Sequence, residues 1–95
     1  MKPHTRIYMK AFGYDESDFI PSELSGKRAN DIHHIESRGM GGDPTGESDR
    51  IENLMAVTRE EHEKYGDKVE FVDFLKIAHF RFMEQNGVLF SRIKV

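Results

Sequence analysis

Short apolar runs and helically spaced apolar residues alternate along this chain. Between residues 3 and 12 the apolar positions follow a helical period, and Gly13 offers a stop. Residues 29–35 and 54–57 are instead compact apolar runs with the length and content of strands. A glycine-rich stretch that contains a proline, residues 39–46, separates the two runs and predicts a long loop. The first part of the chain therefore reads as helix, strand, loop and strand.

Two more helices are expected in the second half of the chain. Thr58 can cap a helix directly after the second strand, and Glu61 stands three residues on to complete a capping box. Residues 68–85 carry apolar side chains at helical spacing, which we expect to face the core, and Asn86-Gly87 supplies a stop. This stripe consists of Phe71, Phe74, Leu75, Ala78 and Phe82. Helices alongside two short strands predict the α+β fold class.

The polar residues that stand out lie on and around the two strands. Three of the five histidines fall between residues 31 and 65, and His33 and His34 are adjacent in the first strand. Asn53 precedes the second strand, and His62 lies on the helix that follows it. Neutral imidazole takes up a proton near pH 7 and also binds divalent metals, which suits metal-assisted hydrolysis. Because neighbouring strand residues point to opposite faces, His33 and His34 can serve one site only if the strand ends or kinks there.

Length and composition narrow the class of protein. With 95 residues the chain is expected to form one small domain, and without cysteine it can form neither disulfides nor thiolate metal sites. There is no apolar run long enough for a bilayer and no signal-peptide pattern, so we expect a cytoplasmic protein with no membrane partner, and a monomer. The formal net charge of -3 argues mildly against a protein that clamps nucleic acid by charge alone.

The order and spacing of His33-His34, Asn53 and His62 resemble the HNH nucleases, also called ββα-metal nucleases. In that family an Asp-His or His-His pair is followed by Asn-Leu, and a histidine stands nine positions after the asparagine, as His62 does after Asn53. The resemblance implies a ββα-metal core at residues 29–66 with flanking helices, inside a single domain that spans residues 1–95. Small stand-alone HNH proteins of this kind are frequent in bacteriophages, and a phage-encoded member would act in the cytoplasm of the host cell.

The resemblance also implies a role for each of these residues. His33 and His62 are implied as ligands of a divalent metal ion, and His34 as the general base that activates water. Asn53 is implied to orient the His34 ring through its side-chain carbonyl, or, as in some family members, to touch the metal. Mg²⁺ is the expected ion, and imidazole ligands also suit Mn²⁺, Ni²⁺ or Zn²⁺. Colicin-type relatives have a further histidine where this chain has Gly66, which predicts an open site that binds metal weakly.

Three charged residues are secondary candidates. Asp31 lies two positions before His33 and so points the same way. It is an extra metal ligand, a hydrogen-bond acceptor for a histidine N–H, or an ordinary surface carboxylate. Arg38 and Arg50 flank the glycine-rich loop and are candidates for contact with DNA phosphates.

Many HNH proteins also hold a structural zinc ion between two Cys-x-x-Cys pairs. At the matching positions this chain has Ser22, Ser25, Thr58 and Glu61. None of these residues offers a thiolate or an imidazole, so no structural zinc is expected here. Packing must then supply the stability that zinc provides in those relatives.

Taken together, the residues and the resemblance predict a metal-dependent endonuclease that hydrolyses phosphodiester bonds in DNA. Little of the chain remains for reading sequence, so we expect low sequence specificity, nicking of one strand, or delivery by a targeting protein. The alternative is a non-catalytic module that uses a ββα scaffold to bind nucleic acid or protein. The acidic balance and the missing zinc cysteines favour that binding module, whereas retention of His34, which a purely structural metal site does not need, favours the enzyme.

Overall fold

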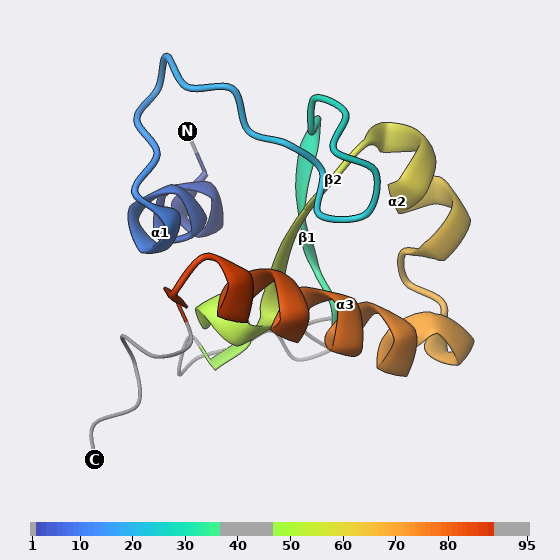
Figure 1. Cartoon of the computed structure of the whole chain (residues 1–95). Helices are drawn as coiled ribbons and strands as arrows, with labels where there is room; N and C mark the ends of the chain where they lie inside the picture. The colour runs from blue at the N-terminus through green and yellow to red at the C-terminus, as the bar shows by residue number, and fades with distance from the viewer. Residues whose placement is uncertain (1, 37–46, 89–95) are drawn as a thin grey trace.

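The computed structural model describes residues 2–36 and 47–88, and within them the chain is a mixed α+β fold (Figure 1). The main elements in chain order are α1 (Pro3–Phe12), β1 (Asp31–His34), β2 (Leu54–Val57), α2 (Arg59–Tyr65) and α3 (Val72–Gln85). Three short 3-10 turns, η1 (Glu47–Asp49), η2 (Ile51–Asn53) and η3 (Val69–Phe71), join them. Each expected helix and strand is confirmed within a few residues, and the loop expected at residues 39–46 lies outside the described ranges.

The two strands form an antiparallel pair at the centre of the fold. Asp31 pairs with Val57 and His34 with Leu54, so β1 runs along the whole of β2. Every residue of β2 is buried, whereas β1 is buried only in part and contacts both α1 and α2. In Figure 1 the two strands stand between α1 and α2, with α3 passing across one end of the pair.

The core has two halves because side chains alternate across the sheet. One half gathers Leu54 and Ala56 of β2 with Tyr8 of α1 and Met83 of α3. The other half gathers Ile35 with Met55 and Val57 of β2 and Leu75 of α3. Helix α3 therefore covers both halves, while α1 closes the first. No helix in the described ranges has the length and apolar content needed to cross a membrane.

Local sequence sets the ends of α1. Pro3 stands in the first turn, where its missing N–H costs no hydrogen bond. Gly13 ends the helix in the left-handed conformation, with φ of 76°, and its N–H reaches back to the carbonyl of Lys10. Gly tolerates this conformation because it has no Cβ, so the expected stop is confirmed.

Helix α3 corrects one expectation about the core. Its buried side chains are Leu75, His79 and Met83, and Phe74 is 48% exposed. The prediction that Phe74 faces the core is therefore wrong. The buried face is centred on His79, a polar residue that an apolar pattern leaves out.

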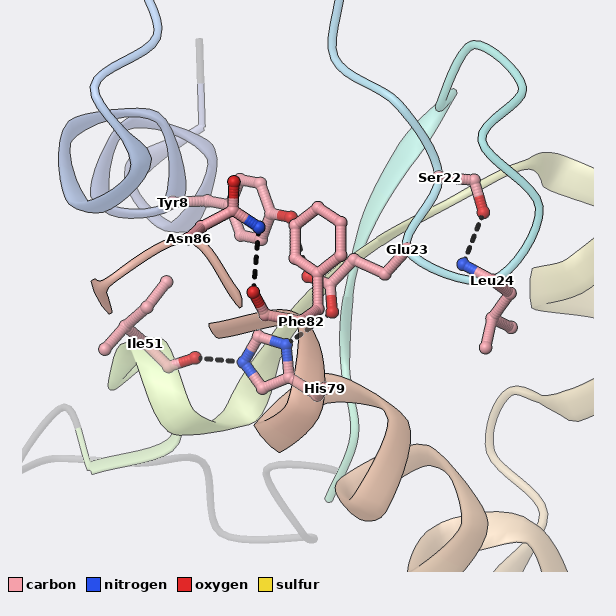
Figure 2. Close-up of polar contacts among 8 residues, drawn as sticks. All are labelled: Tyr8, Ser22, Glu23, Leu24, Ile51, His79, Phe82 and Asn86. Carbon is pink, nitrogen blue, oxygen red and sulfur yellow. Dashed lines mark hydrogen bonds and ion pairs between the residues drawn. The ribbon is translucent and has the colours of Figure 1, made fainter. Parts of the chain in front are cut away.

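His79 is buried because polar partners on both sides of its ring satisfy it (Figure 2). Its Nε2 lies 2.6 Å from the carbonyl oxygen of Ile51, which can only accept, so Nε2 donates. Its Nδ1 lies 2.7 Å from Glu23 Oε1, and the hydroxyl of Tyr8 donates to the other oxygen of Glu23 at 2.6 Å. Burial and the adjacent Glu23 carboxylate raise the pKa of Tyr8 far above its usual range, so Tyr8 stays a donor. This network ties α1, η2 and α3 together.

The four positions that match zinc ligands in HNH proteins come together in the fold. The hydroxyl of Ser22 donates to Glu61 Oε1 at 2.5 Å and accepts the backbone N–H groups of Leu24 and Ser25. Thr58 and Glu61 form the expected capping box at the start of α2. Burial acts to raise the pKa of Glu61, but hydrogen bonds from Ser22, Ser25 and Thr58 outweigh it and lower that pKa. Hydrogen bonds thus join the chain around Ser22 to the start of α2.

Candidate functional site

A cavity of about 550 Å³ runs along β1 between α1 and α2. Four of the five histidines and two carboxylates line it: His4, His33, His34, His62, Asp31 and Asp67. Lys2, which directly precedes α1, and Thr5, which lies in α1, also line the cavity. The structure thus brings together the histidines that the sequence singled out, and adds His4 and Asp67 to them.

His33 and His34 point to opposite faces of β1, as strand geometry requires. His33 faces α2, where its ring centroid lies 4.6 Å from that of His62. His34 faces α1, where its ring centroid lies 4.7 Å from that of His4. Both residues nonetheless line the same cavity.

His33 carries a buried nitrogen whose partner is missing from the described part of the chain. The residue is 4% exposed, and its Nε2 has no hydrogen-bond partner there. Leaving a buried polar atom unpaired costs about 1–3 kcal/mol, so such an atom calls for an explanation. Burial, and then the neighbouring His62, lower the pKa of His33. Near neutral pH the ring is therefore uncharged, with a lone pair available to a ligand.

His62 is placed by the way α2 begins and ends. The capping box starts the helix at Thr58, and α2 ends at Tyr65, just before Gly66. A Cβ at Gly66 would collide with the ring and the backbone oxygen of His62, so a residue without a side chain is needed there. Position 66 is where colicin-type nucleases have a further histidine. In this chain the glycine at that position leaves space for the His62 ring.

Two carboxylates flank the His62 ring. Asp31 Oδ2 lies 3.5 Å from His62 Nδ1, and Asp67 Oδ2 lies 3.8 Å from His62 Nε2. Asp67 adopts a left-handed backbone conformation with φ of 58°, which aspartate tolerates better than most residues. Sequence reasoning missed Asp67, although an aspartate directly after a helix-ending glycine is a recognisable turn signal.

His34 is held by a residue that sequence reasoning also missed. Its Nε2 lies 2.7 Å from Asp49 Oδ1 in η1. An ionised carboxylate only accepts, so His34 donates from Nε2, and in the uncharged form of the ring the lone pair is then on Nδ1. Nothing in the sequence signals this pairing, because the two residues are 15 positions apart, on either side of the glycine-rich stretch at residues 39–46.

Asn53 has partners other than the expected His34 ring. Its Oδ1 accepts the N–H of Glu36 at 2.8 Å, and its amide nitrogen donates to the carbonyls of Glu36 and Ser48. These bonds tie the end of β1 to η1, the turn that carries Asp49. Asn53 thus has only an indirect effect on His34: it connects the two segments that bring His34 and Asp49 together.

The two arginines lie away from this cavity or outside the described residues. Arg50 is exposed and lines a second cavity of about 400 Å³, together with Asn53 and Lys76. Arg38 falls in the range 37–46 and is not described. Their assignment to DNA phosphates stays a prediction.

The possible metal ligands lie closer together on the α1 side of β1 than on the α2 side. One nitrogen each of His4 and His34 and one oxygen of Asp49 all lie within 4.8 Å of one another. Among the described residues no other histidine, cysteine or acidic trio meets that distance, so the expected set of His33, His62 and Asp31 is more open. In that set Asp31 approaches His62.

Comparisons with known proteins add no family to this picture. A scan against protein-family models and searches of curated proteins and of solved structures each found no match for the chain.

Proposed function

We propose that this chain is a metal-dependent HNH-type endonuclease, with β1, β2 and α2 as a ββα-metal core. The observation that carries the proposal is the buried Nε2 of His33, which has no hydrogen-bond partner in the described part of the chain. The His33 ring lies beside that of His62, and both residues line the cavity. On the far side of the same strand, His34 is held by a carboxylate in the manner of a general base.

The residues on the α2 side suit a divalent ion. His33 and His62 would hold it, with Asp31 near enough to His62 to act as a further ligand or as an acceptor for the ring N–H. Mixed nitrogen and oxygen donors accept Mn²⁺, Ni²⁺ or Zn²⁺, and Mg²⁺ when water fills most positions. When bound, such an ion supplies charge compensation to a phosphate and to its leaving oxygen.

His34 would take the proton from the attacking water. Asp49 sets the tautomer that leaves Nδ1 with its lone pair, and this is the form a general base needs. The expected orienting role of Asn53 passes to Asp49 in this proposal, and Asn53 positions Asp49 through the backbone of Glu36 and Ser48.

The proposed substrate is DNA, cut without strong sequence preference. The net charge of -3 gives little general attraction to a polyanion, so binding would depend on the ion and on local cations such as Lys2 at the cavity wall. This favours nicking, or delivery by a targeting protein, over tight binding by the chain alone.

A plasmid-nicking assay with Mg²⁺, Mn²⁺, Ni²⁺ or Zn²⁺ tests the proposal. The unaltered chain should convert supercoiled DNA to open circles in at least one metal and lose that activity with a chelator. His33→Ala and His34→Ala should both abolish cleavage, while Glu60→Ala, on the exposed side of α2, serves as the control. Cleavage that persists in His34→Ala contradicts the assignment of the base. DNA binding without cleavage in any metal would leave the non-catalytic binding module instead.

A further inference from the structure

The α1 side of β1 carries a second set of metal-ligand groups, separate from His33 and His62. His4 comes from the first turn of α1, His34 from β1, and Asp49 from η1. One ligand atom from each of the three lies within 4.8 Å of the other two, and all three side chains are partly buried. Residues from three distant segments therefore converge, and two of them, His4 and His34, line the cavity.

We infer that His4, His34 and Asp49 form a second metal site, which takes Zn²⁺, Co²⁺ or Ni²⁺ in preference to Mg²⁺. Two imidazoles and one carboxylate are the donor set that these transition ions accept in tetrahedral or more open geometry. Mg²⁺ requires near-octahedral oxygen ligands and gives up its waters reluctantly, so this compact set suits it less than the more open set of His33, His62 and Asp31, where water can fill most positions.

The existing separations are close to those that such an ion requires. Ligands about 2.0 Å from a tetrahedral Zn²⁺ stand roughly 3.3 Å from one another. The His34 and Asp49 atoms, at 2.7 Å, must separate slightly, and the His4 atom, at up to 4.8 Å, must move inward. His4 lies in the first turn of α1, and its ring centroid is already 4.7 Å from that of His34.

Occupation of this site has a consequence for catalysis, which rests on the proposed function. His34 cannot serve both as a ligand of this ion and as the base that activates water. A transition ion here would therefore inhibit the enzyme even while a second ion is held by His33 and His62. The chain would be active in Mg²⁺ and shut off by low concentrations of Zn²⁺ or Ni²⁺.

Metal binding by the full chain tests the site without reference to activity. Co²⁺ is titrated into the unaltered chain, His4→Gln and His62→Gln, with calorimetry for stoichiometry and visible absorption for the coordination of cobalt by imidazole. In His4→Gln the affinity of one binding event should fall at least about 10-fold, whereas His62→Gln should keep the affinity of that event. Circular dichroism checks that both variants fold. Equal stoichiometry and affinity in His4→Gln and the unaltered chain would overturn the inference.

Inhibition supplies the second arm of the test. In the plasmid assay with Mg²⁺, added Zn²⁺ should inhibit the unaltered chain, and His4→Gln should need at least about 10-fold more Zn²⁺ for the same inhibition. Because His4 lines the cavity and contacts the His34 ring, each protein's inhibition is measured relative to its own rate in Mg²⁺ alone. Equal sensitivity of the two proteins to Zn²⁺ counts against the site. If no cleavage occurs at all, the proposed function fails, and the cobalt titration alone decides the second site.

Discussion

Replacing Ser22 with alanine should destabilise this protein far more than an ordinary serine substitution. Ser22 is 2% exposed, donates to Glu61 at 2.5 Å, and accepts the N–H groups of Leu24 and Ser25 at 3.0 and 3.2 Å. Ser22→Ala removes all three bonds and leaves the carboxylate of Glu61 with fewer donors. Ser22 stands at one of the positions where the HNH proteins that the sequence resembles have a zinc-binding cysteine, so these bonds are expected to matter for the whole fold.

The size of the effect follows from the partners. A hydrogen bond to a charged group contributes about 1.5–3 kcal/mol, and a neutral one about 0.5–1.5 kcal/mol. Ser25 is exposed, so its N–H can turn to water and recover part of the loss. We expect the free energy of unfolding to fall by about 2–3 kcal/mol, which in a domain of this size lowers Tm by roughly 10–20 °C.

Urea and thermal unfolding followed by circular dichroism measure this loss. Ser17→Ala is the matched control, because the hydroxyl of Ser17 donates to Asp15 on the exposed surface and should contribute within about 0.5 kcal/mol. A Ser22→Ala effect no larger than that of the control would refute the reasoning.

Acid provides a second check on the same bond. The folded-state pKa of Glu61 is lowered below its unfolded value, so the charged form contributes stability above the unfolded pKa and loses it as pH falls through the folded pKa. Part of that stability comes from Ser22. The difference between Ser22→Ala and the unaltered chain should therefore shrink from about pH 7 to about pH 3.5. A difference that stays constant over this range would contradict the role given to the Glu61 carboxylate.

Three further predictions concern the cavity. His34→Ala should lower the cleavage rate by about 10²–10⁴-fold in the plasmid assay, and calorimetry should show unchanged metal affinity at the site that contains His62. A loss of that affinity would contradict the assignment of His34 as the base. Gly66→Ala should displace the His62 ring and lower its metal affinity by about 10–100-fold in a cobalt titration, and unchanged affinity would refute the steric argument. The pKa of His33 is lowered in the folded state, so the unfolded chain binds more protons and stability falls as pH drops from about 6.5 through the folded pKa. His33→Gln should flatten that fall in urea titrations of the metal-free protein, and an equally steep fall would count against it.

Elements whose signals are local could be predicted from the sequence. The stop at Gly13, the capping box of Thr58 and Glu61, and the two strands all depend on residues a few positions apart. The alternation of side chains along a strand likewise anticipated that His33 and His34 would part to opposite faces. Such features follow from backbone geometry and hydrogen bonds within a single turn or strand.

Partners that lie far apart in the sequence were decided by tertiary structure. Asp49 contacts His34 over a sequence separation of 15 positions, and His79 contacts Glu23 over a separation of 56 positions. The second pairing also sets which face of α3 is buried, and so leaves Phe74 half exposed. Polar groups such as these are buried only when a partner arrives from elsewhere in the fold, and local periodicity carries no record of that partner. The sequence by itself therefore predicted the helices, the strands and three of the histidines that line the cavity. Tertiary packing determined which acidic side chains contact those histidines.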